Sequence, residues 1–340
     1  MALEITLYVA VLLVSTLLTW KGSDALELSA SRLAVRYRLP TIVQGSLIVA
    51  VGSSFPELTT TVASSLIHGE FELGMAAIVG SAIFNILVIP GLSGLTTEKL
   101  SYDIRLVYRD AQFYLTSVAV LLLAFAFALI YEPVAEPALA GELTRPIALI
   151  PLALYAVYLF LQQQEWRGEG RSPVDDSVEP SAKAWKDWGL LLLGLALVVA
   201  GVEGLLRTAI WLGDTLGTPT FLWGATVIAA ATSIPDALIS VRGARRGDGD
   251  LSIGNVLGSN IFDLLVAVPV GVLIAGASVV NFAVAAPLMA FLTLATVVLF
   301  TQMRTGLELS RGESVLLLAL YGLFVAWLVL ETMNVVDLLG

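Results

Sequence analysis

The sequence predicts an all-α integral membrane protein with ten transmembrane helices, arranged as two inverted five-helix repeats. Three features support this fold class: long apolar runs, basic residues confined to alternate loops, and similarity between the two halves of the chain. Of the 340 residues, 57% are hydrophobic and only 14% are charged, whereas an average soluble protein carries about 25% charged residues. Runs such as 5–20 and 114–131 show almost no polar face at helical period, which favours a bilayer over a soluble core.

Each predicted span holds close to the roughly 20 mostly apolar residues that a helix needs to cross a bilayer. The spans lie at residues 2–20, 41–66, 73–96, 112–131, 146–162, 188–209, 219–241, 251–274, 280–301 and 313–331. We expect the first to be retained, because it lacks the basic start and small-residue cleavage site of a signal peptide. The polar stretch 162–187 is expected to be a short cytoplasmic linker between a first repeat at 1–161 and a second at 188–340.

The basic residues follow the alternation of these loops. The loops after the odd-numbered spans hold 16 of the 18 Lys and Arg residues, and the remaining two are Arg145 and Arg207. Cytoplasmic loops retain positive charge. We therefore expect both termini outside the cell membrane and the central linker inside. A wrong number of spans would have destroyed the alternation.

The two halves of the chain resemble each other at a nearly constant offset. Residues 24–57 correspond to 203–236 at an offset of 179, and residues 69–85 correspond to 247–263 at an offset of 178. Because each half has five spans, an odd number, the halves must have opposite orientations in the membrane. Inverted repeats are typical of secondary transporters, whose substrate site lies near the midplane between the repeats.

Two equivalent segments, GSSFPE and ATSIPD, place a carboxylate directly after a proline inside a span. Pro56 and Pro235 have no backbone N–H, so the carbonyl four residues earlier loses its helical partner. Freed carbonyls at membrane depth must face protein or a wet cavity. An ionisable residue inside a span usually marks an ion pathway. Glu57 and Asp236, which follow the prolines, are therefore candidates for a cation site.

The motifs GSAIFN and GSNIFD supply a second wall of this site. Ser81 and Asn85 are four residues apart, as are Ser259 and Asp263, so each pair shares one helix face. Calcium takes 6–8 hard oxygen ligands, and carboxylate, amide and hydroxyl oxygens suit it better than they suit transition metals. The predicted metal ligands are Glu57, Asp236, Asp263 and Asn85.

Composition argues against several other classes of protein. The chain has no cysteine, which excludes disulfides, thiol chemistry and Cys-ligated zinc. Its one histidine, His68, falls in a predicted loop and is expected to be solvated rather than to bind a metal. The net charge of −10 argues against a nucleic-acid partner. The expected partners are the lipid bilayer and inorganic cations, with no obligate protein partner evident.

The paired motifs resemble those of the calcium/cation antiporter superfamily, and the chain is identified as a prokaryotic-type member of its sodium/calcium exchanger family. The resemblance extends in architecture over nearly the whole chain. It implies a secondary active antiporter of the cell membrane, not an enzyme, that exchanges sodium for calcium by alternating access without a cofactor. The cation-binding residues that it implies are Glu57, Asp236, Asp263, Asn85, Ser53, Ser54, Ser81, Thr232, Ser233 and Ser259, with backbone carbonyls at Ala50 and Ala229.

One departure from the usual motif bears on the transported ions. Asp236 stands where many sodium/calcium exchangers have Glu, which is similar to the potassium-dependent branch and leaves potassium co-transport open. Glu57, Asp236 and Asp263 would supply three negative charges, balanced by one calcium plus one potassium or by three sodium ions. Because uncompensated charge inside a membrane is costly, we expect these cation sets to replace one another, and the halves to rock only when the site is neutral.

Two alternatives remain beside this hypothesis. The same carboxylates can serve exchange of calcium for protons, although members of the proton-coupled branch typically lack the motif proline. An intramembrane aspartyl protease would use Asp103 in its YD pair and Asp248 or Asp250 in the GDGD stretch. We expect these acids at the basic edge of the membrane, whereas a proteolytic dyad must meet inside it.

Overall fold

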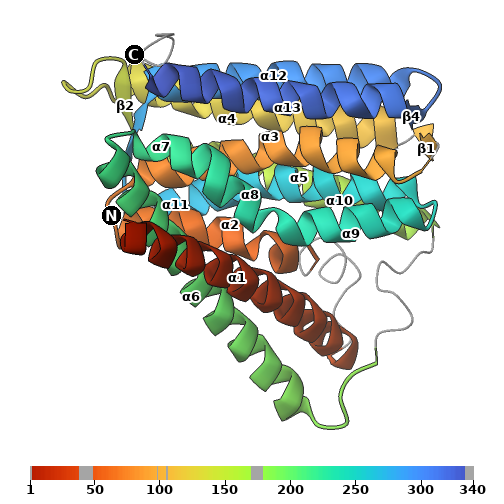
Figure 1. Cartoon of the computed structure of the whole chain (residues 1–340). Coiled ribbons are helices and arrows are strands. Elements are labelled where there is room, and N and C mark those ends of the chain that lie inside the picture. Colours follow the sequence, from red (N-terminus) through yellow and green to blue (C-terminus); the bar gives the residue numbers. More distant parts are fainter. Residues whose placement is uncertain (1, 38–48, 98, 105, 170–178, 334–340) are drawn as a thin grey trace.

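The computed structural model describes residues 2–37, 49–97, 99–104, 106–169 and 179–333 (Figure 1). In these residues α-helices and short π-helical segments (η) dominate, and the strands are only three or four residues long. The elements in chain order are α1 (Ala2–Arg36), α2 (Val49–Leu66), α3 (Phe71–Leu95), β1 (Lys99–Ser101), η2 (Leu106–Asp110), α4 (Ala111–Tyr131), β2 (Ala140–Leu143), α5 (Arg145–Glu169), α6 (Ala184–Leu216), α7 (Thr220–Trp223), η3 (Gly224–Ile228), α8 (Ala229–Thr232), α9 (Ile234–Arg245), α10 (Gly249–Phe262), η4 (Asp263–Ala267), α11 (Val268–Ala275), β3 (Ser278–Asn281), α12 (Phe282–Arg304), β4 (Glu308–Ser310) and α13 (Arg311–Thr332).

Helical structure is present at each of the ten predicted spans. The seventh is divided into α7, η3, α8 and α9, and the eighth into α10, η4 and α11. Within the described residues, eight helices are long and apolar enough to cross a membrane, or nine if the bent pair Thr220–Thr232 and Ile234–Arg245 is one span. Helix α2 is not among them, because its described part carries Glu57 and many hydroxyl residues. Residues 41–48, the predicted start of its span, lie outside the described residues.

Helices α1 and α6 form an antiparallel pair along one side of the molecule (Figure 1). Tyr8 stacks on Trp211 at one end of the pair, with the ring centroids 3.9 Å apart. Near the middle, a Cβ atom on Gly22 would lie 2.7 Å from the backbone nitrogen of Val198. Only a glycine fits such an approach, and small residues commonly allow membrane helices to pack this closely.

The lengths of these helices correct three predicted loop boundaries. Residues 21–36, predicted as part of a loop, continue α1 as helix, because they remain packed against α6. Helix α5 runs to Glu169 and α6 begins at Ala184, so both reach into the predicted linker at 162–187. Residues 170–178 of that linker lie outside the described residues.

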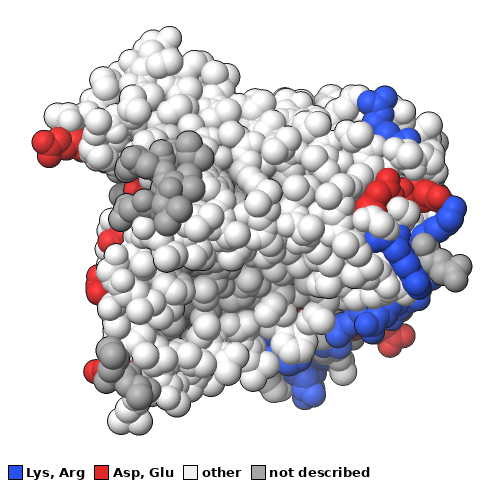
Figure 2. Space-filling model, turned by 45° about the horizontal axis from the view of Figure 1, so that its top comes forward, with Lys and Arg blue, Asp and Glu red and all other residues white. Residues whose placement is uncertain are grey.

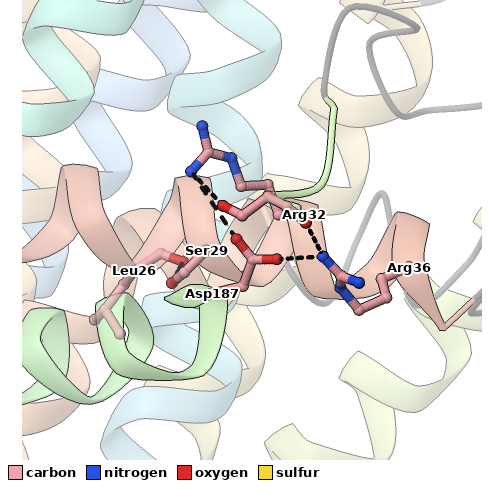
Figure 3. A network of polar contacts seen from close by, with 6 residues as sticks. Leu26, Ser29, Arg32, Arg36 and Asp187 are labelled. Carbon is pink, nitrogen blue, oxygen red and sulfur yellow. Dashed lines mark hydrogen bonds and ion pairs between the residues drawn. The ribbon is translucent and has the colours of Figure 1, made fainter. Parts of the chain in front are cut away.

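An ion-pair network joins the end of α1 to the start of α6 (Figure 3). The fully buried carboxylate of Asp187 lies 3.1 Å from Arg36 and 4.0 Å from Arg32. Arg36 also donates a hydrogen bond to the backbone carbonyl of Ser181, just before α6. A desolvated carboxylate requires partners of this kind, since an unpaired buried charge is strongly destabilising.

Helix α3 lies at the centre of the bundle and is buried along nearly all of its length. It contacts α2, α9 and α10 on one side and α12 and α13 on the other. Two glycines bring it against η3: a Cβ atom on Gly80 would clash with the carbonyl of Ala225, and one on Gly224 would lie 2.5 Å from the carbonyl oxygen of Leu73. The backbones of the two halves therefore touch directly beside Ser81.

The strands form two antiparallel ribbons, which depart from the predicted all-α class. β1 pairs with β4, with Lys99 opposite Ser310, and β2 pairs with β3, with Ala140 opposite Asn281. The ribbons lie at opposite ends of the molecule (Figure 1). Each joins a loop of the first half to a loop of the second half that was predicted on the same side of the membrane. The main-chain pairing satisfies backbone groups in loops too short to form helices.

The basic side chains gather at one end of the molecule. On the face shown in Figure 2, Lys and Arg lie at the end that carries β1 and β4, and only acidic charged side chains are visible at the opposite end. In the ribbon at the basic end, Lys99 pairs with Glu308 at 2.6 Å. This gathering of basic side chains at one end of the bundle agrees with the confinement of Lys and Arg to alternate loops in the sequence.

Replacing Asp187 by alanine is expected to destabilise the α1–α6 pair by about 1–3 kcal/mol, because Arg36 and Arg32 lose a buried acceptor. Thermal or chemical unfolding of the purified protein in detergent measures the change. Asp24→Ala is the matched control: its pair with Lys21 is exposed on the same helix, and its loss should cost less than about 1 kcal/mol. Equal effects of the two substitutions would contradict a stabilising role for the network.

Candidate cation-binding site

The seventh predicted span is broken where the sequence places the proline motif. Helix α8 ends at Thr232, α9 begins at Ile234, and the two segments meet at an angle of 48°. Pro235 lies in the first turn of α9, so the span is interrupted at the proline motif of this half. In the first half, Pro56 lies inside the continuous helix α2. The two equivalent motifs therefore have different backbone conformations.

The two predicted carbonyl ligands lie in the turns that precede these motifs. The Ala229 carbonyl accepts hydrogen bonds from the backbone N–H of Ser233 at 3.1 Å and from the hydroxyl of Thr232 at 3.3 Å. Both of its lone pairs are thus engaged within the helix in this conformation. Ala50 lies in the first turn of α2, where only the backbone is described.

Hydroxyl groups from the two halves meet in the interior. The Ser81 hydroxyl on α3 lies 2.8 Å from that of Ser233, at the break between α8 and α9. The Ser53 hydroxyl on α2 lies 3.4 Å from that of Ser259 on α10. All four side chains are buried. Residues that are about 150 to 200 positions apart in the sequence are therefore joined in one polar cluster.

Asp236 is the most fully paired acid in this cluster. Its carboxylate accepts hydrogen bonds from Ser259 at 3.0 Å, from Asn255 at 3.2 Å and from Asn85 at 3.4 Å. The side chain of Asp236 is 1% exposed. Among the described residues three neutral donors and no basic side chain contact it, so dipoles rather than an opposite charge stabilise its negative charge there.

Several buried oxygens of the cluster accept no hydrogen bond. Glu57 accepts a long one from Ser81 at 3.5 Å through Oε1 and lies beside the Thr232 hydroxyl, but its Oε2 accepts none of normal geometry. Asp263 lies beside Ser54, yet neither carboxylate oxygen nor that hydroxyl makes a hydrogen bond of normal geometry. The Asn85 Oδ1 is also without a donor. Buried acceptors are normally satisfied, so this concentration of oxygens makes the cluster a candidate site for a positively charged ligand.

The acids do not form a metal cage by themselves. Glu57 and Asp236 both lie within electrostatic range of Asp263, but across the described ranges no three Asp, Glu, His or Cys side chains converge closely enough to hold a metal ion. Any cation bound here must therefore take a large share of its oxygens from amide, hydroxyl and backbone groups. Calcium and sodium accept such neutral oxygens, whereas soft transition metals prefer nitrogen and sulfur.

Three polar residues of the cluster were absent from the predicted ligands. Asn255 donates to Asp236 and also to the hydroxyl of Ser240 at 3.3 Å. Asn260 accepts a hydrogen bond from Asn85 at 2.9 Å. The sequence signal for the two asparagines was their place in an otherwise apolar span, four residues before and one residue after Ser259. Ser240 has no such signal, because isolated serines are common in membrane helices.

Two predictions about other polar residues can be compared with the structure. His68 is not a solvated loop residue: its ring is 16% exposed and lies 3.0 Å from the Glu203 carboxylate on α6. Asp103 and Asp250 are exposed at the basic end, where the Asp250 carboxylate accepts a hydrogen bond from the Asp103 backbone N–H at 2.7 Å. These two acids therefore lie exposed at one end of the bundle and not in its interior. That placement does not suit an intramembrane protease.

Comparison with known proteins shows the family to which the chain belongs. A family model described as sodium/calcium exchanger protein matches residues 7–163 and 186–330, which is most of both halves. The chain belongs to the sodium/calcium exchanger protein family. Among relatives of this exchanger family, the sodium/calcium exchanger MaX1 of Methanosarcina acetivorans is 28% identical over 350 residues, covering 94% of this chain and 98% of that protein.

Solved structures and more distant relatives of the exchanger family also match. Structures of the sodium-calcium exchanger NCX_Mj align with a TM-score of 0.59 and 26% identity, covering 95% of this chain and 99% of that one. A shorter stretch of 65 residues is 46% identical to sodium/potassium/calcium exchanger 4 of Homo sapiens, covering 18% of this chain and 10% of that protein. The match to the family thus extends over most of the chain, whereas its likeness to the human protein is local.

Asp263→Asn is expected to raise the thermal stability of the cation-free protein, because it removes a buried charge that has no donor and is close to two other acids. A gain of about 1 kcal/mol corresponds to a Tm increase of roughly 2–4 °C. The same substitution should reduce the further stabilisation that added calcium gives. Asp24→Asn, on the exposed part of α1, should change neither value, and a destabilised Asp263→Asn protein would contradict the prediction.

Proposed function

We propose that this member of the exchanger family is a sodium/calcium antiporter that binds its cations in turn at the buried oxygen cluster between α2, α3, α8–α9 and α10–η4. The observation that carries the proposal is the set of buried oxygens without hydrogen-bond donors on Glu57, Asp263, Asn85 and Ser54. A cation would supply to these oxygens the positive charge that no group in the described part of the chain supplies. The family membership supports sodium and calcium as the two ions.

The ligand set proposed here is the one that the resemblance to the exchanger family implies. The divalent ion would be held directly by Glu57, Asp236, Asp263 and Asn85, because calcium prefers charged and amide oxygens. The acids do not converge closely enough for this among the described residues, so binding would have to draw them closer together. The neutral oxygens that complete the cluster would come from Ser53, Ser54, Ser81, Thr232, Ser233 and Ser259 and from the carbonyls of Ala50 and Ala229. Since all the described hydroxyl groups are buried, a cation entering the cluster exchanges its water shell for protein oxygens.

Charge balance gives the exchange its physical basis. With all three acids ionised, one calcium plus one potassium neutralises the site, and so do three sodium ions. Holding both sets together, or neither, leaves charge uncompensated inside the membrane, which is costly. The two cation sets therefore displace one another, and a conformational change that moves the site between the two sides is easiest when the site is neutral.

The architecture proposed for this process is a pair of inverted repeats that together cross the membrane ten times. The repeats are residues 1–161 and 188–340, with a cytoplasmic linker at 162–187. The equivalent strands β1 and β3 lie in ribbons at opposite ends of the molecule, as opposite orientation of the halves requires. The basic end carrying β1 and β4 would face the cytoplasm of the cell, with both termini outside.

Calcium/proton exchange is the competing proposal for the same carboxylates. The unbalanced acids of the cluster can in principle be neutralised by protons instead of sodium ions. Flux measurements in proteoliposomes, with sodium, potassium and proton gradients imposed separately, distinguish the two. Calcium uptake that follows a pH gradient without sodium would favour proton coupling, and uptake that requires a sodium gradient would favour sodium coupling.

Glu57→Gln and Asp236→Asn are each expected to abolish sodium-driven calcium uptake in proteoliposomes, because each removes one of the charges that compensate the ion. Radioactive calcium uptake into sodium-loaded vesicles measures the effect. The exposed variant Asp24→Asn should retain wild-type uptake. Sodium-driven uptake that persists in either of the first two variants would refute the ligand assignment.

Potassium dependence is expected to be lost in Asp263→Asn. Removing this acid leaves two negative charges, which one calcium balances without potassium. The measurement is sodium-driven calcium uptake by the wild type and by the variant, with and without potassium inside and outside the vesicles. A wild-type protein indifferent to potassium would end the proposal of potassium co-transport while leaving sodium/calcium exchange in place.

A further inference from the structure

Asn260 on α10 is a fully buried amide that bridges three helices. Its Nδ2 donates to the backbone carbonyl of Ala82 on α3 and to the hydroxyl of Tyr114 on α4, each at 3.1 Å. Its Oδ1 accepts from the Nδ2 of Asn85 at 2.9 Å. Tyr114 is in turn hydrogen-bonded to Thr296 on α12. The amide is therefore held on every side by the scaffold around the site.

The chemistry of these partners fixes which way the Asn260 amide points. A backbone carbonyl can only accept a hydrogen bond, so the group that faces Ala82 must be the Nδ2 donor. The Oδ1 of Asn260 must then face Asn85. This assignment follows from the chemistry of a fixed backbone atom, even though the nitrogen and oxygen of an amide have nearly the same shape.

The orientation of Asn260 in turn determines that of Asn85. The Nδ2 of Asn85 lies 2.9 Å from the Asn260 Oδ1 and 3.4 Å from the Asp236 carboxylate, and both of these groups require a donor. A reversed Asn85 amide would place its oxygen against two other acceptors. The Oδ1 of Asn85 is therefore directed away from them, where it is buried and accepts no hydrogen bond.

The two repeats differ at this position in a way that the chemistry explains. Asn85 corresponds to Asp263, and Asn260 corresponds to Ala82, each at the offset of 178. A carboxylate presents an acceptor oxygen whichever way it turns, so Asp263 needs no partner to orient it. An amide presents an oxygen on one side and a donor on the other. The half that contributes the amide ligand therefore requires an orienting partner, and Asn260 provides it.

We propose that Asn260 is a positioning residue for cation binding, which holds the Asn85 amide with its oxygen toward the ion. The inference rests on the proposed function, because it assumes that Asn85 is a ligand. Without Asn260, the Asn85 amide can rotate and present its NH₂ group, whose partial positive charge repels a cation. Residues that orient metal ligands through hydrogen bonds commonly affect metal affinity by roughly 10–100-fold.

The test compares Asn260→Ala, Asn85→Ala and the double variant in the full-length protein. Calcium affinity is measured by calorimetry on the purified protein without sodium, and uptake into sodium-loaded proteoliposomes gives KM and the maximal rate. Ser252→Ala is the matched control, because its hydroxyl joins the same two helices by a buried hydrogen bond to Ser93 at 3.2 Å. Size-exclusion profiles establish that each variant is folded.

Asn260→Ala is expected to bind calcium roughly 10–100-fold more weakly and to raise KM by a similar factor, with a smaller change in the maximal rate. Asn85→Ala should show a loss of similar size. The double variant should be no worse than Asn85→Ala, because Asn260 acts through Asn85. Ser252→Ala should match the wild type, since a merely structural link between the helices does not orient a ligand.

Wild-type calcium affinity in Asn260→Ala, or additive losses in the double variant, would overturn the positioning role. Unchanged affinity in Asn85→Ala would overturn the ligand assignment on which it rests, so the two failures are distinguishable. If Asn260→Ala does not fold, Asn260→Ser replaces it, since the serine hydroxyl can still pair with the Ala82 carbonyl but is too short to hold the Asn85 amide. The same weakening of calcium binding is then expected, and unchanged affinity overturns the proposal.

Discussion

The structure is organised around buried carboxylates that lack opposite charges. Glu57, Asp236 and Asp263 lie within electrostatic range of one another in the interior, and in the part of the chain that the structure describes no basic side chain pairs with them. Isolated charge in a low-dielectric interior is costly. A protein that had no use for cations would gain stability by replacing these acids. In the proposed function a bound cation, rather than the fold, supplies the compensating charge.

The surrounding helices are shaped to bring oxygens to this point. The glycines Gly80 and Gly224 let the backbones of the two halves touch, and the break at Ser233 turns α8 away from α9. Hydroxyl groups of opposite halves then lie within hydrogen-bonding distance. The polar cluster is thus produced by close backbone packing, and the same packing leaves it fully buried. Both requirements of a selective ion site, dense oxygens and exclusion of bulk water, follow from one arrangement.

Much of this could be predicted from the sequence because membrane spans and repeats leave strong signals. Every predicted span contains helix, and the offset between Pro56 and Pro235 located the polar motifs correctly. The extent of α1 was wrong because its second half, around Arg32 and Arg36, is too charged to be recognised as a continuous helix without its partner α6. Asn260 was missed as part of the site because its importance depends on contacts with Ala82 and Tyr114, which no local pattern encodes.

The two strand ribbons have a mechanical consequence. Each ribbon links a loop of one half to a loop of the other by main-chain hydrogen bonds, and one ribbon lies at each end of the bundle. The halves cannot separate as rigid bodies without breaking the main-chain hydrogen bonds of one of these ribbons. Helices α1 and α6 take part in neither ribbon, and they pack closely against each other at glycine positions. We therefore propose that a change of access that preserves both ribbons moves α1 and α6 along the rest of the bundle, instead of rocking the two halves as separate bodies.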